Sequence, residues 1–536
     1  MYNSHRLTRR DILRFFGRVV GAGTAVGVLP GFATTLTNID VGADIPHIKP
    51  MTRDDLVLAD GLNYRVLVWW GQQINSSGEK FGFNNDYTAF LPFDGRPDEG
   101  LLWVNHEELV QGYFDTPADP RSKSLHDVHM EMKEVGGSIL HVKKSGGCWH
   151  VLQDDRYNRR IDANTEIPFV SARPILGRRS ATGTFANCAG GVTPWRTVLS
   201  CEENYHFFTG EVALGPGSRR FVKKGLLGWE RYLDLPPEHY GWVVEVDPFT
   251  GAARKLTALG RYAHESATVV AAADGRCAVY SGDDRSGECI YKFIAARPGS
   301  LEQGTLYVAD TDNGRWLPLA MGMDSRFNKR FTDQTDLLIR TREAAHIAGG
   351  TPQDRPEDIE YDPNTAAVYI SLTKNQRQGR PYGSILRIKE RDNDPLALEF
   401  TARNFISGGT EAGIACPDNL VFDPRGNLWV ANDISSFELN HFPYAGFANN
   451  GLFFIPMSGA AAGQVFQVAS APVGAELTGP TFSADGRTLF LSVQHPGENS
   501  RDLDHLTSHW PGGGNTRPRP CVVTLTGPFL DRYSSV

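Results

Sequence analysis

The sequence has few cysteines, no long apolar run and no surplus of basic residues. Seven cysteines in 536 residues are too few for a disulfide-based scaffold, and the number is odd. No apolar run reaches the roughly 18 residues that a membrane-spanning helix needs. Lys and Arg number 54 against 62 Asp and Glu, a net charge of −8, which argues against a nucleic-acid-binding protein. With 40% hydrophobic and 22% charged residues, the composition is that of a globular protein.

The odd number of cysteines leaves at least one thiol unpaired. Cys277 and Cys289 fall on neighbouring expected strands and could form a disulfide in an oxidising compartment. An unpaired thiol is either a metal ligand or a buried, chemically inert side chain, and its position in the fold decides between them.

The first residues have the features of an export signal. Arg9 and Arg10 form a twin-arginine pattern, and a weakly apolar stretch rich in Gly and Ala follows over residues 15–33. Small residues at its end offer a cleavage site. A basic amphipathic helix packed on the domain is the alternative, but the order of these features favours a signal peptide over residues 1–33. We therefore expect transport by the bacterial twin-arginine export machinery and a periplasmic or secreted mature protein with no stable membrane anchor.

Short strands joined by tight turns recur over residues 34–536. The 56 Gly and 32 Pro favour many turns over long helices. Unevenly spaced hairpins throughout a long chain are typical of a β-propeller. A tandem of β-sandwiches is the alternative, but no linker or composition break divides the chain. We predict one all-β propeller domain over residues 34–536, with insertions near 214–237 and 324–348, the second of them helical. The Asp-Pro and Asp-Gly turns lie at 247–251, 273–276, 361–364, 422–426 and 483–486.

Polar side chains, many of them carboxylates, stand where several expected strands begin or end. In a propeller such ends converge on the central channel, where clustered carboxylates repel one another unless cations neutralise them. Oxygen ligands favour calcium or magnesium, whereas a thiolate among them favours a transition metal such as iron. A lone arginine among carboxylates suits an anionic substrate, most simply phosphate. Each motif alone is more simply a solvated turn, but together they favour a metal centre. The motifs lie at 105–108, 187–188, 201–204, 264–265, 355–358, 417–419 and 494–498.

Most of these motifs resemble those of the PhoX-type alkaline phosphatases. The most specific are Asn-Cys-Ala-Gly-Gly-Val-Thr-Pro-Trp at 187–195 with Cys-Glu-Glu-Asn at 201–204, and Gln-His-Pro-Gly-Glu at 494–498. The segments 260–265, 355–358 and 417–419 also match, in chain order. The resemblance implies a six-bladed β-propeller with inserted loops and short helices. It also implies export by the twin-arginine route and an iron–calcium cluster that hydrolyses phosphomonoesters, with diesters as a second substrate class.

The resemblance further implies roles for individual residues. Arg355 matches the arginine that binds the substrate phosphate. The residues that match iron-side or bridging ligands are Cys188, Glu265 and Glu357. The calcium-side candidates are Glu107, Glu202 and Asp418. The residues expected to orient these ligands are His264, His495 and Asn187.

Three functional classes follow from these observations. The first is a metal-dependent phosphatase acting on a small phosphate ester, working as a monomer without a nucleic-acid partner. The second is a calcium-dependent propeller lactonase or phosphotriesterase, which needs no thiolate. The third is a non-enzymatic binding propeller in which the motifs only shape loops. Iron content separates the first two, and inactivity of a fully metallated sample toward phosphate esters indicates the third.

Overall fold

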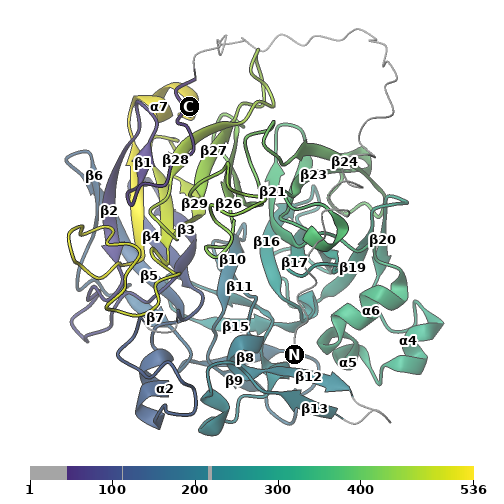
Figure 1. The fold of residues 1–536 in the computed structure, drawn as a ribbon. Helices are drawn as coiled ribbons and strands as arrows, with labels where there is room; N and C mark the ends of the chain where they lie inside the picture. Colours follow the sequence, from purple (N-terminus) through teal and green to yellow (C-terminus); the bar gives the residue numbers. More distant parts are fainter. Residues whose placement is uncertain (1–44, 111–112, 215–219, 536) are drawn as a thin grey trace, which may run out of the picture. The chain divides into compact units, whose positions relative to one another are not determined.

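The computed structural model describes residues 45–110, 113–214 and 220–535, in which six sheets form the blades of a β-propeller (Figure 1). The innermost strands of the six sheets contact one another in a closed ring, in the order β3, β10, β16, β21, β25 and β29. A cavity of about 100 Å³ inside this ring is lined by residues of β3, β10, β21, β25 and β29. The predicted all-β propeller and the six blades are confirmed.

The strands of the first three blades run from the innermost outward as follows. Blade one contains β3 (Asn85–Phe93), β4 (Arg96–His106), β5 (Gly136–Ser145) and β6 (Cys148–Val151), with β7 (Arg159–Ile161) also paired to β5. Blade two contains β10 (Asn187–Val192), β11 (Val198–Glu202), β14 (Val243–Val246), β15 (Ala253–Leu256), β8 (Glu166–Val170) and β9 (Ser180–Thr182). Blade three contains β16 (His264–Ala271), β17 (Cys277–Asp283), β18 (Ile290–Ala295), β19 (Gly304–Asp310) and β20 (Arg315–Pro318).

The other three blades include strands from both ends of the described chain. Blade four contains β21 (Pro356–Asp362), β22 (Ala367–Leu372), β23 (Ser384–Glu390) and β24 (Phe400–Ser407). Blade five contains β25 (Pro417–Phe422), β26 (Leu428–Asn432), β27 (Gly451–Ile455), β28 (Phe466–Ser470) and β1 (Val57–Leu58). Blade six contains β29 (Glu476–Phe482), β30 (Leu489–Gln494), β31 (Cys521–Thr526) and β2 (Asn63–Trp69). Because β2 completes the sheet that ends in β31, the ring is closed by pairing two segments far apart in the chain.

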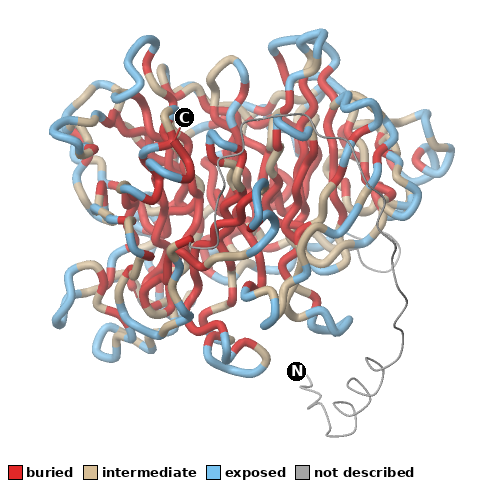
Figure 2. The backbone as a smooth tube through the Cα atoms, turned by 90° about the horizontal axis from the view of Figure 1, so that it is seen from above, coloured by how far each residue is buried: buried red, intermediate tan, exposed pale blue. Residues whose placement is uncertain are grey.

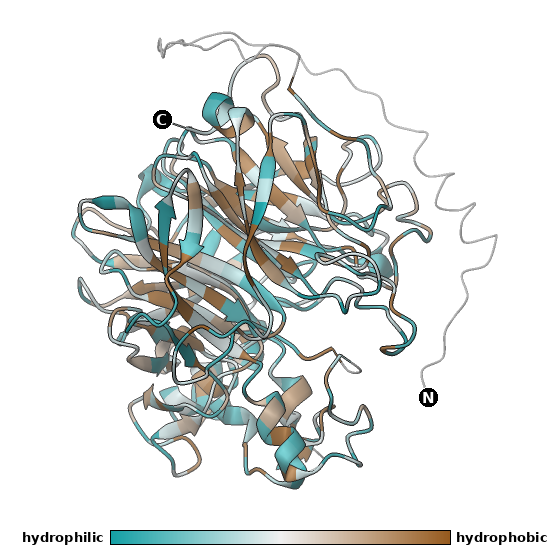
Figure 3. Cartoon of the chain, turned by 90° about the vertical axis from the view of Figure 1, so that its left-hand side faces the viewer, coloured by the Kyte–Doolittle hydropathy of each residue, from teal (hydrophilic) through white to brown (hydrophobic). Residues whose placement is uncertain are grey.

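In blades two to six the second strand is apolar along most of its length, because its two faces pack against neighbouring blades. All residues of β11, β22 and β30 are buried, including the run Leu489, Phe490 and Leu491. Figure 2 shows buried segments running through the interior and exposed ones in the outer loops, and Figure 3 shows hydrophobic residues on many strands. The fold thus buries its apolar side chains between blades, which leaves the channel for polar groups.

The predicted Asp turns connect strands within blades. The turns at 273–276, 361–364, 422–426 and 483–486 each join an innermost strand to the second strand, and the turn at 247–251 joins β14 to β15. Asp423 shows why aspartate suits this position. Its Oδ1 accepts the backbone amides of Arg425 at 3.0 Å and Asn427 at 2.9 Å, which closes the turn.

The predicted insertions lie between strands of the propeller. Residues 214–237 overlap the hairpin of β12 (Glu211–Leu214) and β13 (Arg220–Lys223), between β11 and β14. Residues 324–348 form α4 (Ser325–Arg330), α5 (Gln334–Ile339) and α6 (Thr341–Ala348), as the sequence pattern predicts, between β20 and β21. The other helices of the described ranges are α2 (Leu125–Glu131), α3 (His206–Thr209) and α7 (Pro528–Tyr533), and their 3₁₀ turns are η2 (Trp229–Arg231), η3 (Pro237–His239), η4 (Thr257–Leu259), η5 (Gln376–Gln378) and η6 (Arg391–Asn393).

All seven cysteines are free thiols, so Cys277 and Cys289 do not form the disulfide that neighbouring strands would allow. Cys277 opens β17, whereas Cys289 precedes β18, and the antiparallel register sets Ile290 opposite Gly282 near the end of β17. The two thiols therefore stand at opposite ends of the strand pair. The twin-arginine segment lies outside the described residues. Within the described ranges, none of the helices combines the length and the apolar character needed to cross a bilayer.

Candidate metal centre

Each innermost strand contains a one-residue β-bulge at the same place, close to its first residues. In β10, for example, Asn187 pairs with Glu202 and Gly190 with Ser200, so three steps on one strand match two on the other. The same shift lies between Asn85 and Thr88 of β3. It recurs in β16, β21, β25 and β29. A bulge breaks the alternation of side chains and redirects them, so a side chain at this place can face the channel in blades one to five, whereas β29 has Gly479 there.

Five of the six bulges carry a group that can bind a cation. These side chains form an inner ring, and all five residues are buried: Asp86, Cys188, Glu265, Glu357 and Asp418. Asn84, Ala186, Arg355 and Cys416, each two residues before a member of the inner ring, have positive φ angles between 49° and 55°. Such angles are unfavourable for residues other than glycine and cluster at functional sites. The backbone of the propeller is thus shaped around this ring.

A second ring of polar residues follows the second strand of each blade. The residue directly after the strand is a carboxylate in four blades, a threonine in blade four and a histidine in blade six. From blade one to blade six these residues are Glu107, Glu203, Asp284, Thr373, Asp433 and His495. Since the second strand is antiparallel to the innermost one, its end lies beside the bulge. The two rings therefore stand at one end of the channel.

Members of the two rings form three overlapping groups of possible metal ligands. Within each group, the ligand atoms all lie within 4.8 Å of one another. The groups share Cys188 and Glu265. The Cys188 Sγ lies 3.1 Å from Oδ2 of Asp86 and 2.9 Å from Oε1 of Glu265. The continuous cluster thus runs from β3 across the channel to β25. The groups are Asp86 with Glu107 and Cys188, Cys188 with Glu203 and Glu265, and Glu265 with Glu357 and Asp418.

The electrostatics of the cluster favour bound cations. Burial, followed by repulsion from Glu357 and other neighbouring carboxylates, raises the pKa of Glu265 well above its usual range. Burial likewise raises the pKa of the Cys188 thiol, with further contributions from Asp86 and Glu265, and raises that of Glu107 to about 7. Burial also raises the pKa values of Asp86, Glu203, Glu357 and Asp418. Carboxylates held this close are stable as anions only when positive charge lies between them.

Unpaired oxygen atoms point to the same conclusion. Oδ1 of Asp86, Oε1 of Glu203 and Oε2 of Glu265 are buried and have no hydrogen-bond partner in the protein. A buried polar atom without a partner is costly, which argues that another group satisfies these oxygens. One sulfur and several carboxylate oxygens fit a transition metal next to hard divalent cations. The residues present therefore fit a mixed metal cluster.

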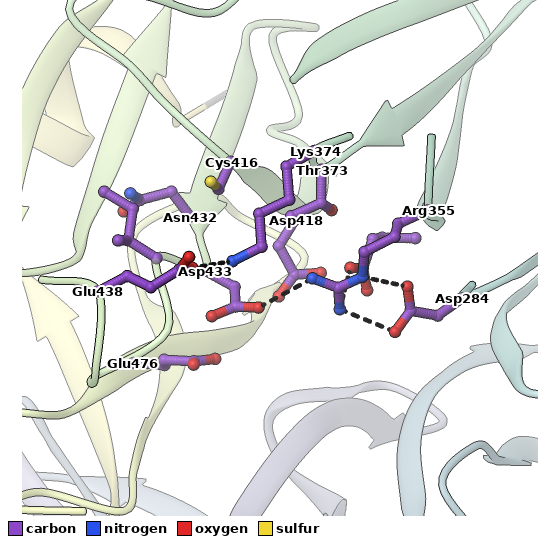
Figure 4. Close-up of polar contacts among 12 residues, drawn as sticks. Asp284, Arg355, Thr373, Lys374, Cys416, Asp418, Asn432, Asp433, Glu438 and Glu476 are labelled. Atoms are coloured by element: carbon purple, nitrogen blue, oxygen red, sulfur yellow. Dashed lines mark hydrogen bonds and ion pairs between the residues drawn. The ribbon is translucent and has the colours of Figure 1, made fainter. Parts of the chain in front are cut away.

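Arg355 lies at the edge of the cluster, directly before β21. Its Nε and Nη2 atoms donate to the two carboxylate oxygens of Asp284, at 2.7 and 2.8 Å (Figure 4). Nη2 is also 2.8 Å from Oε1 of Glu357, and Nη1 lies 3.7 Å from Oδ2 of Asp433. Despite its burial, these carboxylates raise the pKa of Arg355 well above its usual range. The guanidinium is oriented by Asp284 and keeps donor capacity at Nη1.

Most of the sequence-predicted ligands meet in this cluster, but Glu202 does not. Its Oε1 atom is 2.6 Å from Nζ of Lys255, and both side chains are completely buried. Its Oε2 accepts the backbone amides of Gly241 and Trp242. Because neighbouring residues at a strand end point to opposite sides, Glu202 faces its own blade and Glu203 takes the place in the cluster.

Of the three residues expected to orient the ligands, only His495 lies beside a carboxylate of the channel. Its Nε2 is 3.7 Å from Oε1 of Glu476. His264 instead contacts Ser281 and the carbonyl of Gly260, and burial lowers its pKa to about 3. Asn187 donates to the hydroxyls of Thr184 and Ser200. His264 and Asn187 therefore brace the backbone around the bulges.

The sequence interpretation did not single out Asp86, Asp284, Asp433 or Glu476. Glu203 lies in the Cys-Glu-Glu-Asn motif at 201–204, in which the sequence indicates Glu202 as the ligand. The available signal was positional: an acidic residue directly follows the second strand in blades one, two, three and five. Asp86 had no such signal, because the bulge that turns it into the channel is not visible in the sequence.

Comparison with known proteins gives a consistent result. The family model described as "Alkaline phosphatase PhoX" matches residues 43–497. The solved structure of Pseudomonas fluorescens PhoX in complex with vanadate, a transition state analogue, is 30% identical and superposes with a TM-score of 0.79, over 90% of this chain and 98% of that one. A gluconolactonase from Xanthomonas campestris is 13% identical with a TM-score of 0.33, over 90% of this chain and 100% of that one, too distant to support an argument. No curated protein matches the sequence.

Proposed function

The chain belongs to the PhoX family of alkaline phosphatases, and from this premise we propose that it hydrolyses phosphomonoesters, and diesters as a second class, with an iron–calcium cluster held in the propeller channel. It is a metal-dependent phosphatase. The observation that carries the choice of metals is the position of Cys188, whose thiol is shared by two of the three ligand groups. A soft thiolate among hard oxygens favours iron at that point and calcium further away.

The proposed ligands divide along the cluster. Cys188, Glu265 and Glu357 would hold the iron side, as the family resemblance implies. Glu107 and Asp418 would hold calcium, and Glu203 takes the role that the sequence gave to Glu202. When bound, these cations supply a Lewis acid that polarises the phosphoryl oxygen. Their positive charge also offsets the negative charge of the substrate.

The protein's own part in catalysis begins with Arg355. Its planar fork matches two oxygens of a phosphate, and Asp284 keeps the guanidinium in one orientation before the substrate arrives. The surroundings are buried, so the interaction of this charge with developing negative charge is less screened than in water. Arg355 would therefore bind the phosphate and stabilise the transition state without having to reorganise.

The twin-arginine pattern of the first residues supports a location for the protein outside the cytoplasm. We propose transport by the twin-arginine export machinery and action as a monomer in the periplasm or outside the cell. This route carries folded proteins, which suits a chain whose metal ligands come together only when the blades have closed. Changing Arg9 and Arg10 to lysine should leave the protein inside the cell, and unchanged export of that variant would contradict the proposed route.

The test of the phosphatase function is hydrolysis of p-nitrophenyl phosphate by the metal-loaded protein. We expect release of p-nitrophenol, its loss after calcium is removed with a chelator, and its return when calcium is added. A fully metallated sample without hydrolysis would indicate a binding propeller instead. Hydrolysis of a lactone or phosphotriester with calcium alone would indicate the second enzyme class.

A further inference from the structure

Blade four differs from the other blades where the second strand ends. Four blades have an acidic residue at this position, but here β22 is followed by Thr373 and then by a cation, Lys374. The backbone amide of Thr373 donates to the carbonyl of Arg355 at 3.1 Å, so the hairpin of β21 and β22 sets the two segments side by side. Lys374 and Arg355 thus stand at one corner of a mostly acidic rim (Figure 4).

Lys374 is charged and mostly buried, and the side chain of its ion-pair partner, Glu438, is more exposed. Its Nζ lies 2.5 Å from Oε2 of Glu438, and the side chains are 14% and 33% exposed. Burial lowers the pKa of Lys374, but Asp433, Cys416 and the hydrogen bond to Glu438 raise it by more, so the pKa ends above its usual value. The site therefore holds an ammonium group beside Arg355, paired to a carboxylate on the connection between β26 and β27.

We propose that Lys374 is a second substrate-binding cation, which contacts the phosphoryl group together with Arg355, and that Glu438 holds it in position until the substrate arrives. This inference rests on the proposed phosphatase function. A phosphomonoester dianion carries two negative charges, and Arg355 already faces Asp284 and Glu357. A second cation at the same corner supplies positive charge for the phosphoryl group that Arg355 alone does not provide.

The exchange of Glu438 for the substrate phosphate as the partner of Lys374 is energetically reasonable. An ion pair with a partly exposed carboxylate contributes little, because water solvates both groups when they separate. A dianionic phosphate held by metals and by Arg355 is a stronger partner for an ammonium than one carboxylate. Lysine also has a flexible stem and three donors, so it can turn from Glu438 to the substrate without a backbone change.

A purely structural role for Lys374 makes a different prediction. In that case the lysine only fastens the connection between β26 and β27 through Glu438. That connection has further anchors, since Gln376 donates to Oε1 of Glu438 at 2.6 Å and Ser436 donates to Glu498 at 2.6 Å. Removing either partner of the ion pair would then change KM in the same direction. If Lys374 binds substrate, removing Glu438 frees the lysine for the substrate. Loss of Lys374 should then weaken phosphate binding, whereas loss of Glu438 should strengthen it.

The experiment compares Lys374→Met, Lys374→Arg and Glu438→Gln in metal-loaded protein, with p-nitrophenyl phosphate as substrate and inorganic phosphate as inhibitor. We expect Lys374→Met to raise KM and the phosphate inhibition constant by about tenfold with unchanged metal content. Lys374→Arg should recover most of this loss. Glu438→Gln should lower the phosphate inhibition constant by about twofold to fivefold. Lys143→Met, which removes an exposed lysine paired with Glu99 in blade one, is the matched control and should change neither constant.

The results separate the possible failures. Equal increases in KM for Lys374→Met and Glu438→Gln would overturn the inference in favour of a structural role. An active wild type with unchanged constants in Lys374→Met would also overturn it while leaving the phosphatase function intact. A metallated wild type that does not hydrolyse the ester would reject the proposed function and the inference with it. Should Lys374→Met fold poorly, Glu438→Gln alone decides by the sign of its effect.

Discussion

Sγ of Cys188 and Oε1 of Glu265 lie 2.9 Å apart, although the two residues belong to the innermost strands of adjacent blades. The bulge in β10 turns the thiol into the channel, and the start of the bulge in β16 places the carboxylate beside it. The contact thus exists only when neighbouring blades have packed. Metal binding and closure of the propeller should therefore stabilise each other, as in other sites assembled from distant segments.

The first prediction concerns the thiol. Cys188→Ser should lose iron selectively while calcium is retained, because a hydroxyl is a poor substitute for a soft thiolate. We expect hydrolysis to fall at least about tenfold, in line with loss of a Lewis acid. Elemental analysis of the purified variant measures this directly. Cys277→Ser, a buried thiol of β17 away from the cluster, is the control, and full iron retention in Cys188→Ser would mean that the thiol is only a core residue.

The second prediction concerns the fork of Arg355. Arg355→Lys keeps the charge but loses bidentate geometry, so phosphate binding should weaken by roughly 1–3 kcal/mol. KM and the inhibition constant for inorganic phosphate give the measurement. Arg342→Lys is the matched control, since Arg342 makes a similar two-point contact with Asp283. Wild-type constants in Arg355→Lys would rule out its assignment as the phosphate-binding residue.

The third prediction uses two adjacent glutamates. Glu203→Gln should reduce the metal content but keep the fold, because Glu203 faces the cluster. Glu202→Gln should instead lower the free energy of unfolding by roughly 3–5 kcal/mol, because it leaves Lys255 buried without a charged partner. Denaturant unfolding and elemental analysis of both variants test this pair. Metal loss in Glu202→Gln with destabilisation in Glu203→Gln would instead support the ligand role that the sequence predicts for Glu202.

The fourth prediction is a pH dependence of the metal-free protein. Burial raises the pKa of Glu107 to about 7, so the folded state binds this proton more tightly than the unfolded state does. The free energy of unfolding should therefore fall as the pH rises from about 5 to about 7.5, by roughly 3 kcal/mol from this group alone. Urea unfolding in chelator measures the slope, and iron with calcium should flatten it. Stability that rises with pH over this window would contradict the account.

The strands and turns could be predicted from the sequence because the interactions that form them involve residues close together in the chain. The turn at Asp423 is closed by its own carboxylate, and the run from Leu489 to Leu491 is apolar because both faces of β30 are buried. The helices of residues 324–348 were likewise indicated by their spacing. The number of blades followed from the family resemblance, since unevenly spaced hairpins do not fix it.

The site was only partly readable because it depends on backbone irregularities. Cys188 and Glu357 stood in recognisable motifs, but Asp86 reaches the channel through a bulge that leaves no mark in the sequence. The choice between Glu202 and Glu203 depends on which side of β11 each residue faces at the strand end. Two neighbouring strands made a Cys277–Cys289 disulfide possible, but the register keeps the thiols apart.

The most direct test of the central claim is elemental analysis of protein purified after export by its native route, combined with a p-nitrophenyl phosphate assay with and without added calcium. The account predicts iron and calcium together in the protein and hydrolysis that calcium stimulates. Calcium without iron, and no release of phosphate, would contradict it.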